Sequence, residues 1–174
     1  DVVEKIVAVL AVTLTDDEQT LLQAPQTSDL DAYDYAQRGW WYYRQFTKET
    51  NDQARLMFER AIELDAQYAN AIAGLGFTHY ETWAQFWSQD PESLERAFEL
   101  ATEAISQDEN HASAYTLLSH IYLWRKQHEL AITELERALS IEPNNSLYLR
   151  DLAEVLIYSE KPEEAIPLIE KAMR

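Results

Sequence analysis

Alanines recur along this chain at a spacing that places small residues on one face of a helix. Four alanines are each followed by an apolar residue four positions later and by a second alanine seven positions later. The alanines form the pairs Ala54–Ala61, Ala97–Ala104, Ala131–Ala138 and Ala165–Ala172, and the residues between them are Phe58, Ala101, Leu135 and Ile169. Positions i, i+4 and i+7 share a helix face, so each group predicts a helix that packs closely against a neighbour.

The apolar periodicity and the capping residues predict eight helices in four consecutive pairs. Prolines mark two helix starts, at Asp90-Pro91 and Lys161-Pro162, and Pro143 marks one helix end. The expected pairs are 30–47 with 50–65, 68–87 with 91–107, 111–125 with 128–141, and 145–158 with 162–173. They divide the chain into units of about 30–66, 67–109, 110–144 and 145–174. The sequence therefore predicts an all-α fold.

Residues 1–29 predict a separate amino-terminal segment. The apolar stripe of residues 1–14 predicts an amphipathic helix, although its many β-branched residues leave a strand open for part of it. The capping pattern Thr15-Asp-Asp-Glu18 predicts a second short helix over 16–23. Residues 24–29 then predict a linker.

The repeat has a period of 34 residues over its regular part. The first alanines of the last three pairs are 34 residues apart, whereas Ala54 and Ala97 are 43 apart. A 34-residue helix–turn–helix unit is typical of tetratricopeptide repeats. In the third unit the matching residues are Tyr115, Leu118, Ser119, Tyr122, Ala131, Leu135, Ala138 and Pro143. The sequence therefore predicts a right-handed superhelical solenoid of about four tetratricopeptide-like helix pairs over residues 30–174, preceded by one or two short helices.

The nine additional residues of the second unit fall within 81–93 and are rich in aromatic side chains. Tyr80, Trp83 and Trp87 have helical spacing there, so we expect a longer first helix that protrudes from the stack. Two roles stay open for these rings: packing on the neighbouring unit, for example on Trp124 or Trp40, or a dedicated contact with a ligand. A shorter addition of about three residues lies in the turn of the first unit, around 47–52.

In a stack of this kind the first helix of each pair lines a concave surface. Counting positions from the start of each unit predicts an aromatic groove with a few charges at its edge. The predicted partner-binding residues are Trp40, Tyr43, Arg44, Phe77, Tyr80, His120, Leu123, Trp124, Arg150 and Tyr158. Such a surface suits a peptide or helix anchored by apolar side chains. The alternative occupants are the amino-terminal segment and a second copy of the chain.

The composition of the chain limits the kinds of partner and the kinds of chemistry that we expect. The chain has 31 acidic against 14 basic residues, a formal net charge of −17, and no cysteine. Such negative charge repels nucleic-acid backbones and anionic membranes, so we expect a protein or peptide partner, including a second copy, and neither nucleic acid nor membrane. No motif for a nucleophile, a phosphate loop, a metal or another cofactor stands out, so the chain is expected to be non-catalytic. The lack of cysteine fits a reducing compartment and a cytoplasmic location.

Several stretches resemble the carboxy-terminal repeat region of bacterial class III adenylate/guanylate cyclase-like proteins. These stretches are Asp31–Gly39, Ala54–Asp65, the tryptophan-rich insertion with Asp90-Pro91, and Pro162–Met173. The opening residues 1–10 resemble the last helix of the TolB-like domain that precedes the repeats in those proteins. The resemblance implies that the chain is a non-catalytic interaction module of a cyclase-like protein, and that no catalytic residue carries over. Similar regions follow winged-helix transcriptional regulators, so a sensory or multimerising arm of such a regulator is the alternative.

A chaperone-tail receptor is not expected. One subclass of these repeats grips the carboxylate tail of chaperones with lysines and asparagines on the concave surface. The corresponding places in this chain hold residues such as Ala73, Phe77, Thr116, His120 and Glu154. These side chains offer no comparable set of cations to a carboxylate.

Overall fold

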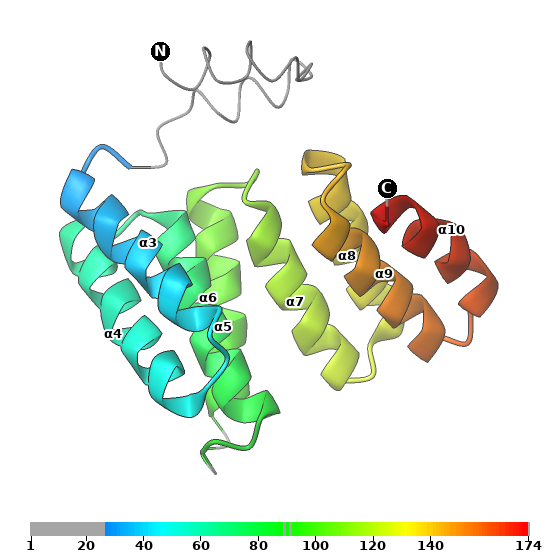
Figure 1. Ribbon diagram of the computed structural model, residues 1–174, viewed down its shortest axis with the longest axis horizontal. Coiled ribbons are helices and arrows are strands. Elements are labelled where there is room, and N and C mark those ends of the chain that lie inside the picture. The colour runs from blue at the N-terminus through cyan, green and yellow to red at the C-terminus, as the bar shows by residue number, and fades with distance from the viewer. Residues whose placement is uncertain (1–26, 89, 91, 174) are drawn as a thin grey trace.

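The computed structural model describes residues 27–88, 90 and 92–173, and this part of the chain consists of helices and turns (Figure 1). The helices predicted over 1–14 and 16–23 lie outside the described residues. The described helices are α3 (Leu30–Tyr43), α4 (Lys48–Leu64), α5 (Ala69–Ala84), α6 (Ser93–Gln107), α7 (Ala112–Trp124), α8 (His128–Ile141), α9 (Ser146–Tyr158) and α10 (Pro162–Ala172). The predicted all-α class is confirmed.

The helices pack as four consecutive pairs, α3 with α4, α5 with α6, α7 with α8, and α9 with α10. Each pair also contacts the next through its second helix, and α3 contacts α5 as α5 contacts α7 (Figure 1). A single pair leaves an apolar face open, so neighbouring pairs must stack to cover it. The stack of tetratricopeptide-like pairs that the sequence predicts is therefore the observed architecture.

Short polar side chains fix several helix starts. Asp29 caps α3 by accepting from the backbone N–H groups of Asp31 and Ala32. Thr47 and Thr50 form a reciprocal capping box at the start of α4, which therefore begins two residues before the predicted position 50. Pro162 occupies the first turn of α10 as expected.

A residue with left-handed backbone follows the first helix of every pair. These residues are Phe46, Phe86, Lys126 and Glu160, with φ between 54° and 60°. After α5, α7 and α9, the N–H of the left-handed residue and the N–H of the next residue both donate to helix carbonyls, as when Lys126 donates to Leu123 and Gln127 to Tyr122. This chain reversal ends the helix sharply without a glycine.

Because of this reversal, two helices end earlier than predicted. The first helix ends at Tyr43 rather than at residue 47, and α5 ends at Ala84 rather than at residue 87. The predicted end at residue 87 is therefore wrong, because the chain turns at Phe86, although α5 with its 16 residues is longer than α3, α7 and α9 as expected. Its rings pack instead on neighbours: Trp83 lies edge-on to Trp124, with ring centroids 5.0 Å apart.

The repeated alanines mark the closest helix contacts. Ala54, Ala97 and Ala131 are fully buried, and so are the alanines seven residues after each of them. Small side chains let helix axes approach, and the larger residues of the facing helix fill the remaining space. The last unit is looser, because Ile169 is exposed and Ala172 is only half-buried.

Phe58 on α4 fills a gap between two glycines of the first helices. Its ring is fully buried, and a Cβ added at Gly39 or at Gly74 would lie 2.6 Å or 2.3 Å from the ring. The edge of Trp40 closes the same space, with ring centroids 5.2 Å apart. This aromatic ring therefore joins α3, α4 and α5 at one point.

We expect Ala131→Leu to lower the free energy of unfolding by about 1–3 kcal/mol, because three added carbons have no free space beside a fully buried Cβ. Urea unfolding followed by circular dichroism measures the change. Leu130→Ala is the control, since Leu130 is the preceding residue of α8 and is exposed. An unchanged midpoint for Ala131→Leu would argue against close packing of α8 at this position.

Candidate functional site

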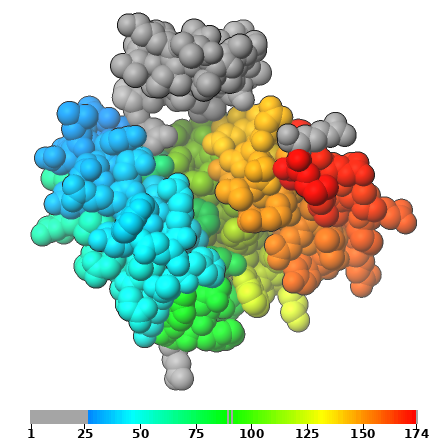
Figure 2. All heavy atoms as spheres, viewed as in Figure 1, coloured from blue at the N-terminus to red at the C-terminus, as the bar shows by residue number. Residues whose placement is uncertain are grey.

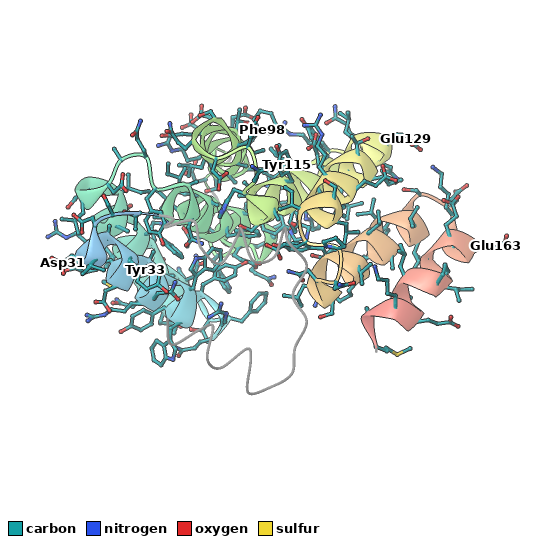
Figure 3. All side chains as sticks on the ribbon, turned by 90° about the horizontal axis from the view of Figure 1, so that it is seen from above. Asp31, Tyr33, Phe98, Tyr115, Glu129 and Glu163 are labelled. Carbon is teal, nitrogen blue, oxygen red and sulfur yellow. The ribbon has the colours of Figure 1, made fainter. Side chains whose placement is uncertain are left out.

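The first helices of the pairs, α3, α5, α7 and α9, lie toward one face of the stack. Figure 2 shows this face hollowed between α3–α4 and α9–α10, with α7 set back between them. Figure 3 shows the opposite side, toward which Phe98 of α6 and Glu129 of α8 lie. We call the hollowed face the concave surface. It is the surface on which the sequence placed the partner-binding residues.

The part of this surface near α3 is built of aromatic rings that also belong to the core. Trp40 donates from Nε1 to Asn70 Oδ1 at 2.7 Å, and its ring meets those of Tyr43 and Phe77. Phe77 is 7% exposed and belongs to a buried cluster of α5, α6 and α7. Phe77 therefore offers almost no surface to a partner, contrary to its prediction as a groove contact, and instead packs beneath Trp40 and Tyr43.

The middle of the surface is a chain of polar-edged rings from α5 and α7. Trp124 donates from Nε1 to the Tyr80 hydroxyl at 2.9 Å. The Tyr80 ring lies 5.4 Å from the imidazole of His120, with the planes tilted by 32°. Burial raises the pKa of Tyr80 to about 12, so this hydroxyl stays protonated at neutral pH. Tyr80 of α5 is thus brought together with His120 and Trp124 of α7, which lie 40 and 44 positions later in the chain.

The far side of the surface, on α9, carries an ion pair that the sequence analysis missed. Asp151 is buried and binds Arg150 at 2.7 Å and His120 Nε2 at 3.3 Å. Burial acts to raise the pKa of Asp151, but hydrogen bonds and charge from His120 and Arg150 outweigh it and hold the pKa below its usual range. An acid between Leu149 and Leu152, inside the apolar stripe of α9, was the available signal.

The other predicted residues lie at the edge of the surface or under it. Tyr158 at the edge is 59% exposed and Trp124 in the middle of the surface is 49% exposed, so both present large rings to solvent. Arg44 and Arg150 are exposed. Leu123 is half-buried and packs against the cluster of α8, α9 and α10, so it contributes little open surface.

Glu81 is a second buried carboxylate at this surface. It is 7% exposed, accepts from the Tyr43 hydroxyl at 3.2 Å, and accepts from Gln85 Nε2 at 3.3 Å. Burial raises the pKa of Glu81, while the hydrogen bonds from Gln85 and Tyr43 act in the opposite direction. Burial and the neighbouring Glu81 charge in turn raise the pKa of Tyr43 well above its ordinary value.

The arrangement suits binding rather than chemistry. Within residues 27–173, apart from the two positions not described, no group of three or more His, Cys, Asp or Glu side chains is placed to hold a metal ion. Tyrosine, tryptophan and carboxylate groups of the surface are hydrogen-bonded to one another, whereas His120 Nδ1 is buried without a hydrogen-bond partner. Among the helices of the described part, none is long and apolar enough to cross a membrane.

The fold and this surface define a tetratricopeptide-repeat region. The family model described as tetratricopeptide repeat matches residues 90–155. MamA is similar in structure, with 20% identity, a TM-score of 0.58, and coverage of 82% of this chain and 72% of that one. So is the first repeat domain of Spaghetti (RPAP3), solved with the HSP90 peptide SRMEEVD, with 16% identity, a TM-score of 0.61, and coverage of 77% and 99%. At these identities the likeness concerns the fold alone.

One relative in sequence is named as an adenylate cyclase. The Rhizobium meliloti (strain 1021) protein named "Putative adenylate cyclase 3" is 29% identical over 128 residues, which cover 73% of this chain. The same alignment covers 22% of that protein, so this chain spans about a fifth of its relative. The resemblance to cyclase-like proteins noted in the sequence is thereby confirmed as a distant homology.

Proposed function

We propose that this chain is a non-catalytic interaction module of a cyclase-like protein, and that its concave surface binds a segment of a partner protein. The observation that carries the proposal is the exposure of the large rings of Trp124 and Tyr158, both at predicted groove positions, while Tyr80 and His120 are held by contacts with neighbouring rings. Large rings held at a surface offer contact area at little cost in conformational entropy. Similarity to the cyclase favours this parent over a winged-helix regulator, and we propose a cytoplasmic location for it.

Self-association is the second candidate, and a specific observation favours it. Besides Tyr158, the last pair exposes Ile157, Ile166, Ile169 and Met173. These apolar side chains from α9 and α10 lie at one end of the stack, where a second copy could cover them. Sedimentation at several protein concentrations separates the two candidates. A dimer that dissociates when Ile166 and Ile169 are changed to serine would support self-association.

Alanine substitution tests the concave surface directly. We expect Trp124→Ala with Tyr158→Ala to weaken partner capture by roughly thirty-fold or more, the effect of losing central aromatic anchors. The proteins retained from native lysate by the immobilised chain would be compared between variants by quantitative mass spectrometry. Trp41→Ala is the matched control, because Trp41 is 60% exposed on α3 and outside the predicted groove. Equal capture by the double variant and the wild type, with helicity unchanged, would contradict the proposal.

A further inference from the structure

The Glu81 carboxylate is buried without a cation. Its partners are a neutral hydroxyl and a neutral amide, from Tyr43 and Gln85. Among the described residues, no lysine, arginine or histidine nitrogen lies within 4.0 Å of it. A carboxylate removed from water is unfavourable unless a positive charge or several strong donors compensate it. Glu81 is therefore a costly residue for folding alone.

The charges around Glu81 do not supply the missing cation. The Tyr80 hydroxyl feels the carboxylates of Glu81, Glu154 and Asp151 together, which places three acids around one part of the concave surface. Arg150 and His120 are the basic groups of the same region. Both contact Asp151, and the charge of His120 acts on Glu81 only from beyond 4.0 Å. An unsatisfied negative potential therefore remains on the α5 side of the surface.

The rings beside these acids suit a cation as well. Tyr43 donates to Glu81, Tyr80 precedes Glu81 on α5 and accepts from Trp124, and Trp124 is half exposed. The negative faces of aromatic rings attract ammonium and guanidinium groups, and the planar guanidinium also stacks on them. The acidic peptide named with the RPAP3 domain would instead meet like charge here.

We infer that the partner segment brings a basic side chain, arginine or lysine, onto the concave surface beside Tyr43 and Tyr80 and toward the carboxylate of Glu81. The inference rests on the proposed function, since it requires a peptide on the concave surface. Charge complementarity selects this occupant: a basic peptide satisfies Glu81, whereas a second copy of this chain carries a formal charge of −17. The negative charge of the chain would also speed the encounter with such a peptide at low salt.

A selection with random peptides tests the inference without knowledge of the natural partner. The immobilised chain would be panned against a phage-displayed library of random dodecapeptides, and the peptides obtained would be synthesised and titrated calorimetrically. We expect a shared arginine or lysine in the selected peptides. Replacing that residue by glutamine in the peptide should weaken binding to the wild-type chain by about tenfold or more, since one member of a buried charge pair is lost.

The substitution Glu81→Gln supplies the second arm. This substitution should weaken binding of the same peptide by about tenfold or more. It should also raise the thermal unfolding midpoint of the free chain, because a buried charge disappears. Glu103→Gln is the matched control, because Glu103 is an exposed acid on α6, a second helix. A fall in the midpoint of Glu81→Gln would mean that the carboxylate serves the fold, and would overturn the inference.

The outcomes separate the inference from the proposed function. The selected peptides could lack basic residues, and their binding could be lost in Trp124→Ala but retained in Glu81→Gln. This result would overturn the basic side chain as the anchor and leave the concave surface as a binding site. Peptides whose affinity is unchanged by both substitutions, or a selection that yields no peptide, would overturn both the inference and the proposed function. Binding that appears only after removal of residues 1–26 would identify that segment as the occupant in place of a partner.

Discussion

Phe58→Ala is expected to lower the free energy of unfolding by about 3–5 kcal/mol, the range for deleting a buried phenylalanine. The ring is fully buried and lies against Gly39 and Gly74, which have no side chains to move into the space it leaves. The cavity should therefore stay open, and the loss should fall in the upper part of the range. Urea unfolding followed by circular dichroism would measure it.

Leu56→Ala is the control for Phe58→Ala, because Leu56 lies on the same helix and is 50% exposed. Its change should stay within about 0.5 kcal/mol, as for most surface substitutions. A loss below about 1 kcal/mol for Phe58→Ala would contradict the account of the ring as the junction of three helices, because it would require the glycine-lined space to collapse.

Gly74→Ala is expected to lower the free energy of unfolding by about 3 kcal/mol, although alanine forms helix better than glycine by about 1 kcal/mol. Overpacking wins because the new Cβ would lie 2.3 Å from a Phe58 ring carbon, and Gly39 blocks the retreat of the ring on the other side. Thermal and urea unfolding would both report the loss. A variant as stable as the wild type would show that the ring can move.

Two further variants sharpen the test of Gly74→Ala. At Gly76 the nearest atom to an added Cβ is Leu117 Cδ2, the far end of a flexible side chain, so Gly76→Ala should cost clearly less. Combining Gly74→Ala with Phe58→Leu should recover part of the loss, since a shorter side chain frees the space. Additive losses in the double variant would contradict direct contact between the two positions.

The sequence was informative about the stack because its signals are local. An alanine at i and i+7 with an apolar residue between them specifies a buried helix face, and Ala54, Phe58 and Ala61 are indeed fully buried. The helix register also placed Tyr80, His120 and Trp124 on one surface, and these residues do meet there. The aromatic half of the candidate site therefore follows from spacing alone.

The polar half of the site depends on contacts between residues far apart in the chain. The hydroxyl of Tyr43 reaches Glu81 across 38 positions, and His120 reaches Asp151 across 31. The periodicity of the sequence does not predict such pairings, because a charged residue on a helix is usually expected to face solvent. The predicted end of α5 was wrong for a different reason: Phe86 adopts a left-handed backbone that favours glycine, and no glycine marks this turn in the sequence.

The distribution of tryptophan gives this stack an uneven optical signature. The five indoles lie at residues 40, 41, 83, 87 and 124, and none lies in α8, α9 or α10. The last helix buries little beyond Ala165, so this end of the stack is where partial opening costs least. Tryptophan fluorescence would therefore stay nearly native while the last pair opens and the helical ellipticity falls. The difference between the melting temperatures from fluorescence and from circular dichroism would measure how much more stable the first pairs are than the last pair.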